Sequence, residues 1–177
     1  MPPDALVVLC GPAASGKSLF ARRNARRTQI VSSDRCRALV GDDESDQRFS
    51  PRAFDLFHRT IAHRLALGRF TIADSTALSP DARRDLRRIA RRAGRPVALV
   101  AFATPLSDCL RNNAARKRRV PADVLRAQHA RFREQRGRLA AEGYAALVTL
   151  SPREAPAARL RATPAIGPSS RKKGGSR

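Results

Sequence analysis

The 177 residues suffice for one domain with a sizeable core, and 42% hydrophobic with 29% charged residues is typical of a soluble globular protein. The charge is unusual, because 36 Lys and Arg residues against 15 Asp and Glu residues give a net charge of +21. This excess favours a partner that carries phosphate groups, although arginine also covers solvated helix faces. Residues 5–10 are the longest early apolar run, too short to cross a membrane, and three cysteines without a CxxC pair argue against a disulfide framework or a zinc knuckle. We therefore expect a cytoplasmic protein without a membrane partner.

The predicted elements alternate along the chain between short apolar runs and longer segments of helical periodicity. The apolar runs, which we predict to be strands, are residues 5–10, 29–32, 69–74, 96–102 and 145–150. Such alternation is typical of a mostly parallel sheet with crossover helices. The sequence therefore predicts an α/β fold with a parallel sheet of four or five strands.

Two of the helical segments carry clear start and stop signals. Ser50 and Pro51 provide a cap and a first-turn proline, and Gly68 closes the segment. Ser79 and Pro80 open the next helix in the same way. Further helices are predicted at residues 19–27, 35–40, 105–116 and 121–139.

The end of the chain differs from the rest in composition. Residues 162–177 are rich in Gly, Pro and Ser and contain four basic and no acidic residues, which predicts a disordered basic tail. Without this tail, a charge of +17 remains on residues 1–161, which we expect to form one folded domain.

A complete GxxxxGK[ST] motif follows the first predicted strand and begins a helical segment. In this motif backbone N–H groups converge on phosphate oxygens, Lys17 reaches the outer phosphates, and the hydroxyl of Ser18 is a ligand for Mg²⁺. The sequence therefore predicts a P-loop NTPase-like fold that binds ATP and Mg²⁺. The predicted nucleotide-binding residues are Gly11, Ala14, Ser15, Gly16, Lys17 and Ser18.

Acidic residues follow the second and third predicted strands, where the carboxyl ends of parallel strands face one crevice. Asp34, preceded by Ser33, could act as a general base on an attacking hydroxyl, or it could only cap the next helix. Asp74 could hold Mg²⁺ through water or orient an arginine, or it could form a turn. Arg37 lies one helical turn after Asp34 and could stabilise transition-state charge.

Two charged clusters complete the candidate features. The acidic run of Asp42, Asp43, Glu44 and Asp46 could be a metal site, but its spacing lacks the EF-hand pattern and a solvated loop is the alternative. About a hundred residues after the P-loop, a basic cluster lies where P-loop kinases place a helical lid, although it could also be a solvated basic helix. This cluster consists of Arg111, Arg116, Lys117, Arg118 and Arg119.

Taken together, these motifs resemble the kinase domain of bacterial polynucleotide kinase-phosphatase and, more distantly, phage polynucleotide kinase. The resemblance runs through most of the chain, and the combination of SSDxCR with DDExDQ is more specific than the P-loop. The matching stretches read GPAASGKSLFA, IVSSDRCRALVGDDESDQ, AFDLFHRTIAHRLALGRFTIADST and RNNAARKRRVP.

The resemblance implies a P-loop kinase domain at residues 1–161 and roles for individual residues. Asp34 would be the general base on a 5′-hydroxyl, Arg37 would contact the acceptor and donor phosphates, and Asp74 would orient that arginine. Gln47 would lie near the site, and the predicted substrate-binding residues are Ser33, Asp34, Arg37, Gln47 and Asp74. Arg116 and Arg119 would be lid arginines, the first catalytic and the second nucleotide-binding.

The chain departs from this family at two points. Such lids usually read Arg-Asn where this sequence has Asn112-Asn113, so that Arg111 would have to substitute. The resembling enzymes also continue into phosphatase and adenylyltransferase modules that the sequence does not contain, so either repair of a broken end would need a separate phosphatase or ligase partner, or the physiological acceptor is a different one.

The predicted function is therefore phosphate transfer from ATP to the 5′-hydroxyl end of RNA or DNA. A kinase for a small metabolite would share loop, base and lid but would need no basic groove, and +17 on residues 1–161 favours the polynucleotide. A nucleotide-dependent nucleic-acid-binding module without catalysis is a third interpretation. With no Trp and one Tyr, contacts to nucleic acid would depend on phosphates more than on aromatic stacking.

Overall fold

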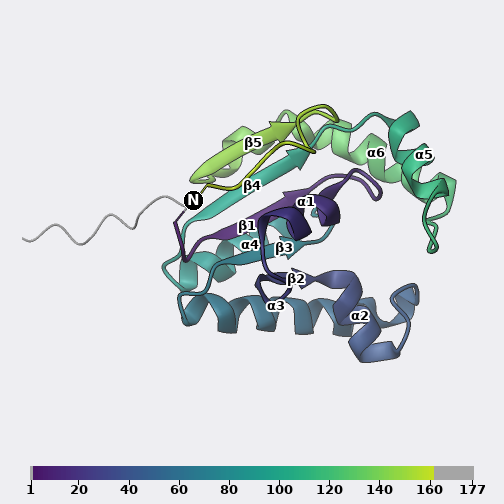
Figure 1. The fold of residues 1–177 in the computed structure, drawn as a ribbon. Coiled ribbons are helices and arrows are strands. Elements are labelled where there is room, and N and C mark those ends of the chain that lie inside the picture. Colours follow the sequence, from purple (N-terminus) through teal and green to yellow (C-terminus); the bar gives the residue numbers. More distant parts are fainter. Residues whose placement is uncertain (1, 162–177) are drawn as a thin grey trace, which may run out of the picture.

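A computed structural model describes residues 2–161 and shows one five-stranded parallel sheet between helical layers (Figure 1). The predicted α/β class is confirmed. The strands run in the order β2-β3-β1-β4-β5, so β1 lies at the centre with β3 and β4 on its two sides. Their bounds are Leu6–Cys10 for β1, Ile30–Ser32 for β2, Thr71–Asp74 for β3, Val97–Phe102 for β4 and Ala146–Leu150 for β5.

The helices occupy the connections between the strands. The α-helices are α1 at Lys17–Asn24, α2 at Ser33–Gly41, α3 at Ser50–Ala66, α4 at Pro80–Arg92, α5 at Leu106–Ala114 and α6 at Ala122–Arg136. Short 3₁₀ helices are η1 at Arg27–Gln29, η2 at Gln47–Phe49 and η3 at Leu139–Glu142. The helix predicted at residues 121–139 is shorter than expected. It ends at Arg136, because Gly137 is the C-cap and the chain continues as a turn.

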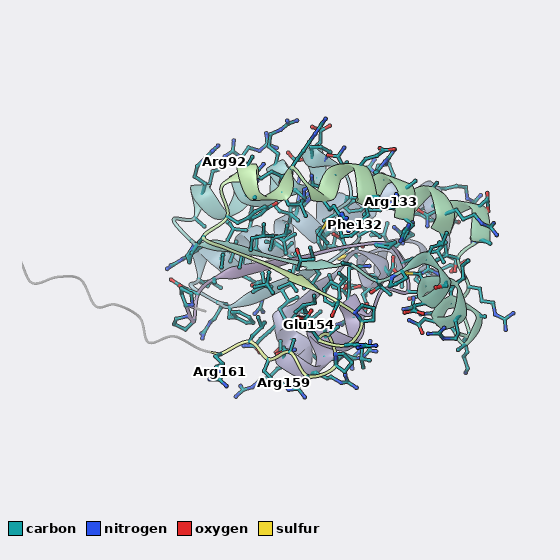
Figure 2. The ribbon with its side chains drawn as sticks, turned by 90° about the horizontal axis from the view of Figure 1, so that it is seen from above. Arg92, Phe132, Arg133, Glu154, Arg159 and Arg161 are labelled. Atoms are coloured by element: carbon teal, nitrogen blue, oxygen red, sulfur yellow. The ribbon has the colours of Figure 1, made fainter. Side chains whose placement is uncertain are left out.

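The core has two parts because successive side chains of each strand point to opposite faces of the sheet. Leu6 and Val8 of β1 pack on the face covered by α3 and α4, where Phe57 and Leu86 are buried. On the other face lie alternate β1 residues, α1 and the segment that follows β5. Figure 2 shows α6, with Phe132 directed toward the sheet, on one side and the segment with Glu154 and Arg159 on the other.

A buried ion pair braces the connection that follows β3. Arg83 of α4 is fully buried, and its Nη2 donates to Oε1 of Glu142 over 2.5 Å. Nη1 of the same side chain donates to the backbone carbonyls of Ala77 and Leu78. The hydroxyl of Tyr144 donates to the second carboxylate oxygen of Glu142. This network fixes the residues that lead out of β3 toward the carboxyl edge of the sheet.

All five strands end at the same edge, toward which α2 and α5 also project in Figure 1. The loops after β1, β2, β3 and β4 therefore meet there. None of the described helices is long and apolar enough to span a bilayer. The tail predicted at residues 162–177 lies outside the described residues.

Candidate active site

A large cleft of about 1150 Å³ opens at the carboxyl edge of the sheet. Its walls come from the loop after β1, the N-terminal end of α2, the end of β3 and the loop between α5 and α6. Six cationic side chains line it, which are Lys17, Arg22, Arg37, Arg116, Arg118 and Arg119. Three acidic side chains face them, which are Asp34, Glu44 and Asp74. The lining is therefore cationic overall, which suits an anionic ligand.

The loop between β1 and α1 has the backbone geometry of a phosphate-binding loop. Gly16, at the N-cap of α1, has a φ of 100°, in a region that residues with a Cβ rarely occupy. Ala14 is also left-handed, with a φ of 59°, a strained conformation of the kind that clusters at functional sites. The first helical hydrogen bond runs from Phe20 N to Gly16 O, so the first N–H groups of α1 face the cleft without helical partners.

Lys17 is buried at the bottom of this loop. Its Nζ donates to the carbonyls of Gly11 over 2.9 Å and Pro12 over 2.6 Å. Burial lowers the pKa of Lys17 to about 8, with Arg116 acting in the same direction and Asp74 opposing it. The ammonium group is therefore held in a poorly solvated position, where phosphate oxygens would be stronger partners than neutral carbonyls.

Side chains from distant parts of the chain hold the loop backbone in place. Oγ1 of Thr104 donates to the carbonyl of Ser15 over 3.0 Å, and Nδ2 of Asn112 donates to that of Ala14 over 3.1 Å. Oε1 of Gln128 on α6 accepts from Ala13 N over 2.8 Å. Three elements beyond β4 thus fix a loop near the start of the chain.

Asp74, at the end of β3, is buried next to the P-loop. Burial raises the pKa of Asp74, while Lys17 and a hydrogen bond with Ser18 oppose that shift. Ser18 and Asp74 together offer a hydroxyl and a carboxylate oxygen, the donor types that Mg²⁺ prefers. No hydrogen bond joins Asp74 to Arg37 among residues 2–161, so the prediction that Asp74 orients Arg37 has no support in the contacts.

Asp34 lies in the first turn of α2 and lines the cleft together with Lys17. Ser32 is the N-cap, since its hydroxyl accepts from Arg35 N, so capping does not occupy the Asp34 carboxylate. Oδ1 of Asp34 accepts from Nη1 of Arg37 over 2.8 Å. Arg37 is itself buried and donates further to Ser50 Oγ. The buried guanidinium of Arg37 therefore fixes the orientation of the Asp34 carboxylate.

The second oxygen of Asp34 is bound from the opposite wall of the cleft. Nη1 of Arg118, in the loop between α5 and α6, donates to Oδ2 of Asp34 over 2.9 Å and lies 3.6 Å from Oε1 of Glu44. The buried side chain of Asn113 closes this loop by bonding both the N–H and the carbonyl of Val120. The hydrogen bonds of Asn113 therefore stabilise the loop from which Arg118 reaches across the cleft to Asp34.

The structure brings most of the predicted site residues together. Besides Lys17, Asp34 and Asp74, the cleft is lined by Ala14, Gly16, Ser18, Ser33, Arg37, Gln47, Arg116 and Arg119. Gly11 and Ser15 lie behind the surface, where the Gly11 carbonyl and the Ser15 hydroxyl accept from Lys17 Nζ. Arg111 is not part of the lining and pairs with Asp108 over 2.7 Å.

The sequence analysis did not single out Arg22 and Gln128 as lining residues, and it did not predict the contact that Glu44 makes. Arg22 lies one turn after Ser18 on the same face of α1, a spacing that could have revealed it. Glu44 belongs to the acidic run, but its reach to Arg118 depends on tertiary structure. Gln128 gives no sequence signal, because its role is to bond a backbone N–H far away along the chain.

The sheet order, the P-loop between β1 and α1, and the lid-like loop before α6 define a P-loop kinase fold. A family model described as an AAA domain matches residues 6–139. The chain therefore belongs to this AAA domain family. No curated protein matches the sequence significantly.

Solved structures with the same fold include kinases for different acceptors. The Pnkp1/Rnl/Hen1 RNA repair complex contains a chain with a TM-score of 0.67 and 17% identity, over 78% of this chain and 47% of that one. This chain thus spans about half the length of that relative. A gluconokinase from Sinorhizobium meliloti 1021 gives a TM-score of 0.57 at 19% identity, over 85% of this chain and 84% of that one. The Mycobacterium tuberculosis APS kinase CysC, in complex with AMPPNP and APS, gives a TM-score of 0.51 at 17% identity, over 86% of this chain and 90% of that one. At these identities the likeness shows the fold alone.

Proposed function

We propose that this chain is an ATP-dependent kinase that transfers the γ-phosphate of ATP to the 5′-hydroxyl end of RNA or DNA. The observation that carries the proposal is the cleft in which the Asp34 carboxylate and the Lys17 ammonium line one space under an arginine-bearing loop. A P-loop alone would support nucleotide binding; the aimed carboxylate adds the means to activate a hydroxyl.

The P-loop half of the cleft fits the triphosphate. The N–H groups at the start of α1 would bind phosphate oxygens, and Lys17 would exchange its carbonyl partners for them. Ser18 and Asp74 would hold Mg²⁺, with Asp74 acting directly or through water. When bound, Mg²⁺ would neutralise charge on the phosphates and so ease attack at the γ-phosphorus.

The α2 half of the cleft fits the acceptor. Asp34 would take the proton of the acceptor hydroxyl as its oxygen bonds to the γ-phosphorus, and the bond from that phosphorus to the β,γ-bridging oxygen breaks to release ADP. Arg37 would keep Asp34 oriented and stabilise charge on the transferred group. In this step the hydroxyl would displace Arg118 from Oδ2 of Asp34, which that guanidinium contacts over 2.9 Å in this structure.

The lid loop provides cations for the developing charge. Arg116 and Arg119 line the cleft and have no carboxylate partner within residues 2–161. Their guanidinium groups would contact the donor phosphates when nucleotide is bound, and the loop would limit access of water. Gln47 and Ser33 line the acceptor end, where they would contact the terminal nucleotide.

A small-metabolite kinase is the second candidate, supported by the gluconokinase and APS kinase structures that share the fold. The same Asp34 chemistry would serve a sugar hydroxyl. The charge of +21 on the whole chain supports the polynucleotide instead, since a sugar kinase would share the lid arginines that contact ATP but would need no further positive charge.

An acceptor panel tests the proposal. The full chain is incubated with Mg²⁺ and γ-labelled ATP together with 5′-OH oligonucleotides of RNA and DNA, and separately with small alcohols, sugars and nucleosides. We expect label on the oligonucleotides. Label on a sugar or other metabolite with none on oligonucleotides would establish the second candidate.

A non-catalytic nucleotide-dependent binding module is separated from both kinases by Asp34→Ala. A binding module would lose nothing, whereas a kinase would lose rate and keep ATP affinity. The components named in the Pnkp1/Rnl/Hen1 RNA repair complex belong to that complex; for this chain, a separate phosphatase or ligase partner is part of the proposal.

A further inference from the structure

A second, smaller pocket lies next to the cleft on the edge of the sheet. Its volume is about 280 Å³, and residues of η1, β2, α2 and α3 line it. β2 is the outer strand of the sheet, beside α2 and α3 in Figure 1, so this pocket faces outward. Ser32 lines both the pocket and the cleft and therefore marks the point where the two meet.

The two spaces are separated by the first turns of α2. Asp34 and Arg37 face the cleft, while Arg35 and Leu39 face the pocket. Arg35 and Leu39 are four residues apart and so share a side of the helix. A linear ligand whose end reaches Asp34 can cross the N-terminal end of α2 at Ser32 and continue into the pocket.

The pocket combines an apolar floor with a cationic rim. Leu39 is 75% exposed although it is a large aliphatic residue, and Leu56 and Ile30 lie beside it. At the rim, Arg27 and Arg35 are exposed, and neither guanidinium has a carboxylate partner within the described residues. An apolar surface next to unpaired arginines is complementary to a nucleobase and its backbone phosphate.

We propose that this pocket binds the nucleotides that follow the 5′ end of a single-stranded acceptor. The inference rests on the proposed function and deepens it, since the terminal nucleotide would lie in the cleft and the next ones over Ser32 and in the pocket. Phosphates would contact Arg27 and Arg35, and a base would pack against Leu39. Binding would be independent of base sequence, because apolar contact and phosphate contacts carry no donor and acceptor code.

An extended peptide that adds to the edge of β2 is the competing occupant of this surface. The observations favour the polynucleotide because β2 offers only the three residues Ile30–Ser32 for pairing, and because the pocket shares the lining residue Ser32 with the cleft that contains Asp34.

Acceptor length tests the inference. At saturating Mg²⁺-ATP, kcat/KM is measured for a nucleoside 3′-phosphate and for 5′-OH oligonucleotides of two, three, four and ten nucleotides. We expect kcat/KM to rise over the first few nucleotides and then to level off. In the double variant Arg27→Ala/Arg35→Ala, and separately in Leu39→Ser, this rise should shrink by about tenfold, with the nucleoside 3′-phosphate unaffected.

The salt dependence adds a second readout. Each lost phosphate contact should reduce the slope of log KM against log salt concentration by about 0.7 for a single strand. The matched control is Arg91→Ala/Arg92→Ala, two exposed arginines of α4 without carboxylate partners within residues 2–161; Figure 2 labels Arg92. This control should leave both the length dependence and the slope unchanged.

The outcomes separate the inference from the proposed function. If wild type labels no 5′-OH oligonucleotide of any length, the proposed function itself fails. If wild type labels them without length dependence, or if both double variants lose activity equally, the pocket is not the binding site. A peptide that competes for the pocket while the Leu39→Ser variant keeps normal length dependence would also overturn the inference in favour of a protein partner.

Discussion

The two halves of the cleft are built in different ways. On the P-loop side, Lys17 is buried, and three side chains from later elements, including Thr104 and Gln128, hold the loop backbone. On the α2 side, Asp34 is 48% exposed and is bound by Arg118, whose own side chain is 29% exposed. The first half is a continuous motif whose backbone is held by hydrogen bonds from later elements, and the second depends on a partly exposed ion pair, Asp34 with Arg118, between separate segments.

This difference fits the two roles in the proposed function. A rigid donor half would suit the triphosphate, which would be the same in every catalytic cycle, whereas a substrate would displace Arg118 in the acceptor half. Exposed ion pairs are weak enough for such replacement, since solvent screens them to about 0–1 kcal/mol. The hydrogen bonds that hold the loop backbone on the donor side need no such replacement.

The buried ion pair between Arg83 and Glu142 gives the largest expected effect, which is on the free energy of unfolding. Arg83→Leu leaves Glu142 and two backbone carbonyls without their buried partner, so the free energy of unfolding should fall by about 3–5 kcal/mol. Arg84→Leu, on the same helix, removes only an exposed pair with Asp81 and should cost less than about 1 kcal/mol. Urea denaturation measures both, and equal losses would refute the contrast between the buried and exposed pairs.

Lys17 gives the largest catalytic effect in the donor half. Lys17→Met removes the ammonium that would meet the outer phosphates, and kcat/KM for ATP should fall by about 10²–10³-fold. Steady-state kinetics at varied ATP concentration measure the loss. Lys117→Met, in the exposed lid loop and outside the cleft lining, is the matched control and should change little.

Arg118 tests whether the acceptor half is held closed by its own side chains. Arg118→Ala frees Oδ2 of Asp34 to water, so ATP hydrolysis without an acceptor should rise, by up to about tenfold. Release of labelled inorganic phosphate measures this rate. Arg119→Ala removes a neighbouring arginine that does not bind Asp34; if it raised hydrolysis as much, Arg118 would have no special role.

Asn112 gives the smallest expected effect. Asn112→Ala removes one neutral hydrogen bond to the P-loop carbonyl of Ala14, and KM for ATP should rise about two- to tenfold. Arg111→Ala, one residue earlier, removes an exposed pair with Asp108 and should leave KM unchanged. A larger effect at Arg111 would mean that this arginine acts in the lid after all.

The contrast between the halves also explains what could be predicted from sequence. The P-loop and the five strands lie in continuous stretches, so periodicity and one motif predict them, with strand bounds that differ by two residues at most. Contacts such as Arg118 with Asp34 join residues 84 positions apart and leave no local pattern. A cluster of arginines predicts that the loop is cationic, but not which side chain crosses the cleft.

The N-cap of α2 shows the same limit of prediction from sequence. Ser32, Ser33 and Asp34 are all good N-cap residues, and sequence alone leaves the choice open. The structure places Ser32 at the cap and leaves the Asp34 carboxylate to two guanidinium groups. The register of β2 decides this, because the strand ends at Ser32, where it pairs with Asp74 of β3.

The central claim is that Asp34 activates the acceptor hydroxyl opposite the P-loop, and Asp34→Asn tests it most directly. The transfer rate to a 5′-OH oligonucleotide at saturating ATP and the equilibrium affinity for ATP are measured on the same preparation, with Asp42→Asn on the exposed loop as control. If Asp34 activates the hydroxyl, we expect a rate lower by about 10²–10⁴-fold with ATP affinity retained. Undiminished transfer by the Asp34→Asn variant would contradict it.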